Sequence, residues 1–204
     1  MQTTVILANG DFPVHPKALQ VLREADRIVC CDGAADGLLA FGRDPDFIIG
    51  DLDSVSPEVR ERFSDRLIPI DEQDTNDLSK AFYFCQFKGW DNLVILGATG
   101  KREDHTLGNI ALLADFAQQA FVRMLTNTGE FIYIDSTQTI PSFPGQAVSF
   151  FQTVPDTRFK TQGLMYPLDG IDFSKWSQAT LNKAEGESFT VTVEKGAALL
   201  FLAF

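Results

Sequence analysis

The order of apolar segments along the chain constrains its fold most strongly. Up to about Leu125, short continuous apolar runs alternate with stretches of helical periodicity. Continuous apolar strands that alternate with helices are typical of a parallel sheet covered on both faces. We therefore predict an α/β domain over residues 1–125, with strands at residues 4–8, 28–31, 47–49, 67–70 and 93–96.

The helices between these strands carry recognisable start signals. Pro16 and Pro57 each occupy a first helical turn, where the missing N–H costs little, and Ser56 is a suitable N-cap. A later apolar stripe at i, i+3, i+4 and i+7 predicts a helix through Leu78, Ala81, Phe82 and Cys85. We expect Asp74 or Thr75 to cap that helix.

The pattern changes after Leu125. Helical periodicity fades, glycine and proline turns recur, and short strand-like pieces lie at residues 131–134, 148–151, 189–193 and 199–202. Such a pattern is typical of all-β structure. We predict a small β-sandwich domain over residues 126–204.

Composition narrows the class of protein. The chain has 204 residues, of which 45% are hydrophobic, so two small domains with real cores are possible. A net charge of −11 argues against nucleic acid or an anionic membrane as the main partner, but it permits a cationic substrate. No apolar run approaches the roughly 20 residues that span a bilayer.

The N-terminal segment and the cysteines indicate a compartment. The first residues lack the basic region of a signal peptide, so we expect a cytoplasmic protein. The three cysteines show no zinc-type spacing, and their odd number suits reduced core thiols.

Five aspartates form two clusters, each directly after a predicted strand. Asp51 and Asp53 follow one strand, and Asp71, Asp74 and Asp77 follow the next. Because Asp51 and Asp53 are two residues apart, we expect them to face the same side of an extended segment. Carboxylates gathered at one edge of a sheet repel one another unless a cation or protons neutralise them. Oxygen ligands of this kind suit Mg²⁺, which bridges to substrate phosphates. The alternative is a solvated acidic loop, and Asp74 could instead serve only as an N-cap. The repetition after successive strands favours a metal site.

The other predicted strands also end in polar residues. They lead to Asn9-Gly10, to Asp32-Gly33, and to the loop from Gly97 to Gly100, which precedes Lys101, Arg102, Asp104 and His105. Ligands of open α/β sheets bind at the carboxyl ends of the strands. The glycine loop would present backbone N–H groups to phosphate, although it lacks the Walker pattern. Lys101 and Arg102 could hold phosphate oxygens or could be solvated loop charges. Together these features predict Mg²⁺-dependent phosphoryl-type transfer from a nucleotide.

Four sequence blocks resemble the thiamine pyrophosphokinase family. They lie at residues 31–35, 49–54, 73–77 and 97–105 with Asn109, and further matches lie at residues 163–168 and 181–182. The resemblance implies an ATP- and Mg²⁺-binding catalytic domain, followed by a sandwich that binds thiamine and dimerises. It also implies a homodimer in which thiamine lies between one subunit's nucleotide domain and the other's sandwich. The reaction implied is ATP-dependent pyrophosphorylation of thiamine, which yields thiamine diphosphate and AMP.

The resemblance also implies roles for particular residues. The expected metal ligands are Asp51, Asp53 and Asp77, which are also the catalytic candidates, supported by Asp32 and Asp74. The expected nucleotide contacts are Asn9, Gly33, Gly100, Lys101, Arg102, Asp104 and His105. The expected thiamine contacts are Gln73, Tyr166 and Asn182. Tyr166 could instead be a core tyrosine, and Asn182 a turn residue.

The chain departs from the family pattern at several positions. Ala34 replaces a frequent glycine, Asn76 a usual threonine, and Leu181 a serine, while Tyr166 stands where some members have tryptophan. Two rival functions remain open at this point. One is a Mg²⁺-dependent nucleotide pyrophosphatase with water as nucleophile. The other is a regulatory protein that binds nucleotide or thiamine without turnover, which the full acidic set disfavours.

Overall fold

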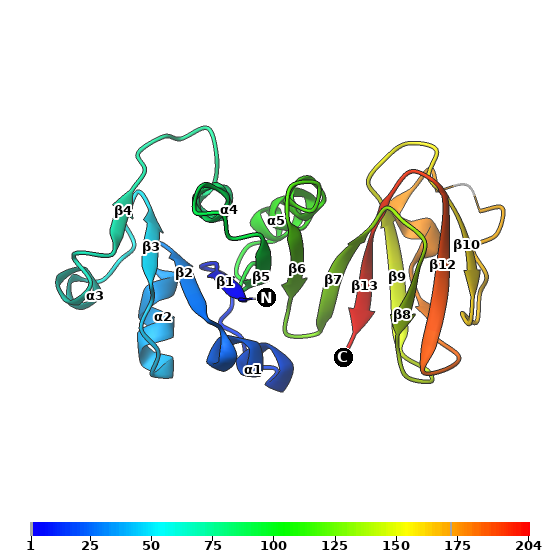
Figure 1. Ribbon diagram of the computed structural model, residues 1–204, viewed down its shortest axis with the longest axis horizontal. Coiled ribbons are helices and arrows are strands. Elements are labelled where there is room, and N and C mark those ends of the chain that lie inside the picture. Colours follow the sequence, from blue (N-terminus) through cyan, green and yellow to red (C-terminus); the bar gives the residue numbers. More distant parts are fainter. Residues whose placement is uncertain (1, 172) are drawn as a thin grey trace. The chain divides into compact units, whose positions relative to one another are not determined.

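The computed structural model describes residues 2–171 and 173–204 and contains two compact units, one up to Asn127 and one from Thr128 onward. The first is α/β and the second is all-β, which confirms the predicted fold class (Figure 1). None of the helices among the described residues combines the length and apolar character needed to cross a lipid bilayer.

The first unit is built on a six-stranded parallel sheet. Its elements are β1 (Thr4–Leu7), α1 (Pro16–Glu24), β2 (Arg27–Cys31), α2 (Ala34–Phe41), β3 (Phe47–Gly50), α3 (Pro57–Arg62), β4 (Leu67–Pro69), α4 (Asp77–Phe87), β5 (Asn92–Leu96), α5 (Glu103–Phe116) and β6 (Phe121–Leu125). The strand order is β6-β5-β1-β2-β3-β4. The five predicted strands are present. β6 was not predicted, because Arg123 interrupts the continuous apolar run expected of a buried strand. The strand is only partly buried, and Phe121 at its start is exposed.

The strand order reverses beside β1. The chain proceeds outward from β1 to β4 and then returns to place β5 on the other side of β1. Helices α1 and α2 cover one face of the sheet and α4 and α5 the other (Figure 1). In open α/β sheets such a reversal leaves a crevice at the carboxyl ends of the strands, where ligands bind.

The start of α4 differs from the prediction. Asn76 is the N-cap, and its Oδ1 accepts a hydrogen bond from Ser79 N at 2.9 Å. The backbone N–H groups of Asp74 and Thr75 instead donate to Glu72 Oε2, at 2.8 and 3.0 Å. Glu72 thereby holds both residues in a turn before the helix, so the prediction that Asp74 or Thr75 caps α4 was wrong.

The second unit consists of two antiparallel sheets. Its elements are β7 (Gly129–Ile134), β8 (Gln138–Pro141), β9 (Ala147–Gln152), β10 (Arg158–Gln162), the 3₁₀ helix η1 (Trp176–Ala179), β11 (Asn182–Lys183), β12 (Ser188–Lys195) and β13 (Ala198–Ala203). One sheet has the order β11-β9-β13-β7 and the other β10-β12-β8. The four predicted strands are present. β8, β10 and β11 are short and only partly buried, and the sequence pattern did not reveal them.

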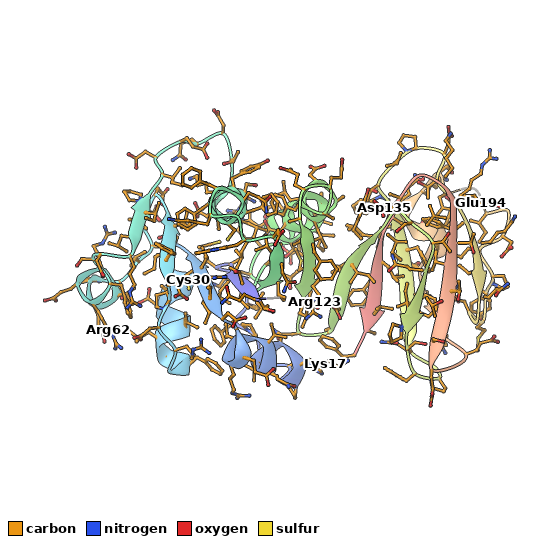
Figure 2. All side chains as sticks on the ribbon, in the orientation of Figure 1. Lys17, Cys30, Arg62, Arg123, Asp135 and Glu194 are labelled. Carbon is orange, nitrogen blue, oxygen red and sulfur yellow. The ribbon has the colours of Figure 1, made fainter. Side chains whose placement is uncertain are left out.

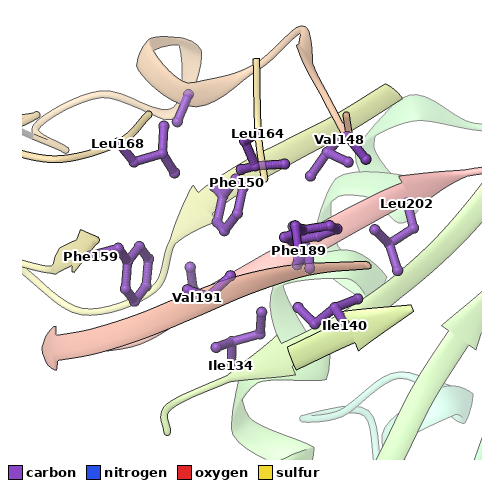
Figure 3. Close-up of a cluster of buried hydrophobic side chains, with 14 of the residues drawn as sticks. Ile134, Ile140, Val148, Phe150, Phe159, Leu164, Leu168, Phe189, Val191 and Leu202 are labelled. Atoms are coloured by element: carbon purple, nitrogen blue, oxygen red, sulfur yellow. The ribbon is translucent and has the colours of Figure 1, made fainter. Parts of the chain in front are cut away.

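Each unit has its own apolar core. Phe150 from one sheet of the second unit packs with Phe159 and Phe189 from the other, as expected of a sandwich (Figure 3). In the first unit, Cys30 lies in the interior of the sheet region while Arg62 lies at the surface (Figure 2). Cys31 and Cys85 are likewise free and buried, as predicted for core thiols.

Candidate active site

A pocket of about 450 Å³ lies at the carboxyl ends of β1, β2, β3 and β5. Its volume is in the range of small-molecule sites. The predicted site residues that line it are Asn9, Asp32, Asp51, Asp53, Gln73, Asp77, Gly100, Lys101, Arg102 and His105. Gly33, Asp74 and Asp104 are not among its lining residues, and Tyr166 and Asn182 belong to the second unit.

Three carboxylates form the acidic part of the pocket. Asp32, Asp51 and Asp53 each offer an oxygen, and these oxygens lie within 4.8 Å of one another. Asp32 is only 4% exposed. Its Oδ2 accepts a hydrogen bond from Ser54 N at 3.3 Å, whereas its Oδ1 is buried and has no hydrogen-bond partner among the described residues. A buried carboxylate oxygen without a partner is costly, so this donor set fits a hard cation such as Mg²⁺.

Asp51 and Asp53 converge for a different reason from the one expected. They do not lie on an extended segment, because Leu52 between them has a φ of 66° and the chain turns there. Asp53 N donates to Asp51 Oδ1 at 3.3 Å. The extended geometry assumed for the two aspartates was therefore wrong, although both carboxylates join the cluster.

Asp77 supplies a fourth carboxylate from the first residue of α4. Gly50 lies between it and Asp32. A Cβ atom on Gly50 would meet Asp32 Cβ at 3.1 Å and Asp77 Oδ1 at 3.2 Å, and the φ of Gly50 is 152°. Glycine at the end of β3 thus lets the two aspartates approach from either side.

The acidic groups shift one another's protonation. Burial is the largest cause that raises the pKa of Asp32, to about 6, and the nearby Asp53 and Asp77 carboxylates add to it against the hydrogen bond from Ser54. Burial likewise raises the pKa of Asp77, although the Lys80 ammonium opposes the rise. Perturbed carboxyl groups in a pocket are typical of functional sites.

Lys80 is a pocket residue that the sequence analysis missed. Its side chain is only 4% exposed, and its Nζ lies 3.3 Å from Asp77 Oδ1. Residues 78–82 of α4 are all buried, so this turn is enclosed around its whole circumference. The available signal was the spacing of three residues from Asp77, which puts both side chains on one helix face.

The basic residues beside the glycine loop are tied to neighbours. Lys101 Nζ donates to the backbone oxygen of Asn9 at 2.9 Å and to its Oδ1 at 3.1 Å. Arg102 pairs with Asp104 at 2.5 Å, and both side chains are about two-thirds exposed (66% and 63%). Asp104 therefore contacts Arg102 rather than the pocket.

Gly33 also has a packing role outside the pocket lining. A Cβ atom there would lie 2.9 Å from both Asn9 Nδ2 and Ser54 O. This close approach lets the segments after β1, β2 and β3 meet. Gly33 thus packs against Asn9 and Ser54, which line the pocket.

Backbone strain gathers at the same edge of the sheet. Among the described residues, five non-glycine residues have a positive φ, and Asp32, Leu52 and Lys101 are three of them. Such conformations are unfavourable for most side chains and cluster at functional sites. Here they mark the segments that follow β2, β3 and β5.

Tyr166 and Asn182 lie together in the second unit. Tyr166 is 59% exposed, so the core alternative for it was wrong. Asn182 is only 3% exposed, and its side chain accepts from Tyr166 N at 3.1 Å and donates to Tyr166 O at 2.7 Å. The amide of Asn182 is therefore occupied in holding the backbone that presents Tyr166. Asn182 begins β11 and is not the turn residue that was considered.

The fold and the pocket define an α/β protein of the phosphoryl-transfer class, with clustered carboxylates and a glycine loop at a switch point of the sheet. Residues 18–125 match the family model described as thiamin pyrophosphokinase, catalytic domain. Residues 129–201 match the one described as thiamin pyrophosphokinase, substrate-binding domain. The chain belongs to the thiamine pyrophosphokinase family, whose enzymes transfer pyrophosphate from ATP to thiamine.

Individual proteins agree with this assignment. Thiamine pyrophosphokinase 3 of rice (Oryza sativa subsp. japonica) is 32% identical over 205 residues, which cover 85% of this chain and 76% of the rice protein. The crystal structure of thiamine pyrophosphokinase from Bacillus subtilis superposes with a TM-score of 0.86 at 23% identity, covering 99% of both chains. The solved structure of thiamin pyrophosphokinase from Candida albicans also has a TM-score of 0.86, at 16% identity, covering 100% of this chain and 89% of the other. At these identities the two structures establish the shared fold.

Proposed function

We propose that this chain transfers a pyrophosphate group from ATP to the hydroxyl of thiamine in a Mg²⁺-dependent reaction, so that thiamine diphosphate and AMP form. The observation that carries the metal dependence is the buried, unpartnered Oδ1 of Asp32 within a group of three converging carboxylates. A water-solvated acidic loop would leave no such oxygen without a partner.

The metal ligands proposed are Asp32, Asp51, Asp53 and Asp77, all of which line the pocket. Asp74 was expected among them, but it is exposed and outside the pocket lining, so it is left out of the proposed set. When bound there, Mg²⁺ neutralises negative charge on the phosphates. One carboxylate of the set accepts the proton of the thiamine hydroxyl as it attacks the β-phosphorus of ATP.

The cationic side of the pocket holds the nucleotide. Lys101 and Arg102 donate to phosphate oxygens, and the N–H groups of the loop that ends at Gly100 support them. Lys101 is already oriented by Asn9, which limits the side-chain freedom lost on binding. His105 and Asn9, which also line the pocket, provide further nucleotide contacts.

Thiamine is bound by groups from both units in a homodimer. Gln73 in the pocket contacts the aminopyrimidine, and the exposed ring of Tyr166 from the second unit of the partner subunit packs on the cationic thiazolium. An acidic pocket suits a cationic substrate. We place the enzyme in the cytoplasm, in keeping with three reduced, buried cysteines.

Product analysis tests the proposal directly. The protein is incubated with ATP and Mg²⁺, with and without thiamine, and AMP, inorganic pyrophosphate and thiamine diphosphate are measured. We expect AMP and thiamine diphosphate in equal amounts, and little AMP without thiamine. AMP and pyrophosphate formed regardless of thiamine would instead identify a nucleotide pyrophosphatase. Absence of turnover with intact ligand binding would identify a regulatory protein.

A further inference from the structure

Lys80 is a buried cation at the wall of the acidic pocket. Its side chain is 4% exposed, and its ammonium lies 3.3 Å from Asp77 Oδ1. Burying an ammonium group is costly unless an anion is close by. Asp77 supplies that anion, and the other oxygen of its carboxylate remains for a different partner. Lys80 therefore holds Asp77 in one orientation.

The other basic pocket residues are engaged elsewhere. Lys101 donates to Asn9, and Arg102 pairs with Asp104. Among the described residues, Lys80 is thus the cation in contact with the metal-ligand candidates. It offsets part of the charge of the four carboxylates, and a divalent cation that enters the pocket is repelled by its ammonium.

We propose that Lys80 is a positioning residue that fixes Asp77 and keeps the affinity of the nucleotide-free pocket for divalent cations low. The metal then enters with the nucleotide, whose phosphates outweigh the repulsion from Lys80, and leaves with the products. This inference rests on the metal role proposed for the carboxylates, but it concerns the protein without ATP or thiamine.

Lys80→Gln separates charge from hydrogen bonding, because the glutamine amide can still donate to Asp77 Oδ1. Binding of Mn²⁺ to the nucleotide-free protein is measured by titration calorimetry. We expect Lys80→Gln to bind Mn²⁺ on the order of tenfold more tightly than the wild type. A factor of this order corresponds to the water-screened repulsion between an ammonium group and a divalent cation several ångströms apart. Lys17→Gln, which removes the same charge from an exposed position of α1, is the matched control and should bind as the wild type does.

A second measurement, thermal unfolding, tests the inference even if Lys80→Gln is less stable than the wild type. Melting temperatures are recorded in EDTA and in saturating Mn²⁺. The metal should raise the melting temperature of Lys80→Gln by more than it raises that of the wild type, since tighter binding stabilises the folded state further. Lys80→Arg, which keeps the charge, should restore the wild-type response. A Lys80→Gln protein that is unfolded with and without metal would show a purely structural lysine and overturn the inference.

The remaining outcomes separate this inference from the proposed function. Equal Mn²⁺ affinity in Lys80→Gln, Lys17→Gln and the wild type would overturn the role of Lys80 alone, provided that thiamine-dependent AMP formation persists. Absence of Mn²⁺ binding at millimolar concentration in every variant, even with ATP present, would instead remove the metal role of the carboxylates, and this inference with it.

Discussion

The side-chain amide of Asn76 donates a hydrogen bond to Asn109 Oδ1, with 3.0 Å between the two atoms. Asn76 also caps α4, through Ser79 N, and Asn109 Nδ2 donates to Ala98 O at 2.8 Å. The two asparagines thus connect the start of α4, which carries Asp77, to the loop after β5. Asparagine at position 76, in place of the family's usual threonine, has a physical reason, because a threonine side chain has no second polar group for Asn109.

Asn76→Ser should therefore retain the helix cap and lose the bridge to Asn109. We expect a fall in kcat of about three- to tenfold, the kinetic equivalent of one modest hydrogen bond, with the stability nearly unchanged. Asn76→Ala loses the cap as well and should also reduce the free energy of unfolding by about 1 kcal/mol. Steady-state kinetics and urea unfolding measure both effects. A serine variant with wild-type kcat would contradict a positioning role for the bridge.

Two aspartate variants should differ in stability although both lose activity. Asp51→Asn and Asp77→Asn each remove a proposed metal ligand, so thiamine diphosphate formation should fall to background. In EDTA, Asp51→Asn relieves repulsion within the cluster and should melt no lower than the wild type. Asp77→Asn leaves the buried ammonium of Lys80 without its anion and should be less stable by about 1–3 kcal/mol. Chemical denaturation in EDTA measures this difference.

The outcome that would contradict this distinction is equal stability of the two variants. Lys80→Met combined with Asp77→Asn provides the control. Because the double variant no longer buries a charge without its partner, it should be more stable than Asp77→Asn alone.

The raised pKa of Asp32 predicts a pH dependence of the metal-free protein. The folded-state pKa is about 6, above the value near 4 of an unfolded chain, so the folded state binds the proton more tightly. The associated stability is fully present below about pH 4 and is lost as the pH rises through about 6, by at most about 3 kcal/mol. Asp32→Asn should lack this dependence and be more stable than the wild type at pH 7 in EDTA.

Urea unfolding at several pH values between 4 and 8 measures the effect. Asparagine tolerates the positive φ of 45° at this position, so the variant introduces little strain. Asp44→Asn, at an exposed pair with Arg62, is the control for a general loss of negative charge. Identical pH profiles for Asp32→Asn and the wild type would contradict the raised pKa.

The sequence predicted the architecture because the strong signals are local. Apolar runs that end in polar residues identified five strands of the first sheet, and the rule that ligands bind at the carboxyl ends of strands correctly placed Asp32, Asp51 and Asp77 at one edge. β6 was not predicted from the sequence, because a partly exposed strand lacks a continuous apolar run.

The side-chain contacts that support the site could not be predicted from local sequence patterns. Lys80 resembles any helical lysine in sequence, and only tertiary packing makes it a buried partner of Asp77. Asn182 was expected to contact substrate, yet its side-chain amide is hydrogen-bonded to the backbone of Tyr166, sixteen residues away in the chain. Such roles depend on side-chain geometry between distant segments, which periodicity and motif spacing do not report.

Tyr166 and Asn182 should respond differently to truncation. Tyr166→Ala removes an exposed ring and should raise the KM for thiamine by about tenfold, with little effect on the KM for ATP or on the melting temperature. Asn182→Ala leaves two partly buried backbone groups of Tyr166 without their partner and should cost about 1–3 kcal/mol of stability. Kinetics with each substrate varied, together with thermal unfolding, separate the two. Equal effects of Tyr166→Ala on both KM values would contradict a contact with thiamine.

The final prediction concerns sites shared between two subunits. Asp51→Asn disables the acidic pocket, and Tyr166→Lys adds a positive charge that should repel thiazolium from an exposed position of the second unit. If each site combines one subunit's pocket with the other's Tyr166, a mixed dimer has one doubly damaged site and one intact site. Random pairing in a two-fold dimer makes about half of the dimers mixed, so the mixture should recover roughly a quarter of wild-type activity.

The experiment mixes the two inactive variants after joint unfolding and refolding, and it measures thiamine diphosphate at a thiamine concentration where each variant alone is inactive. Each variant refolded by itself is the control. Mass spectrometry of differently tagged chains verifies that mixed dimers form. If mixed dimers are present and no activity returns, each subunit builds its own site. A monomer at the assay concentration would also contradict a site shared between subunits.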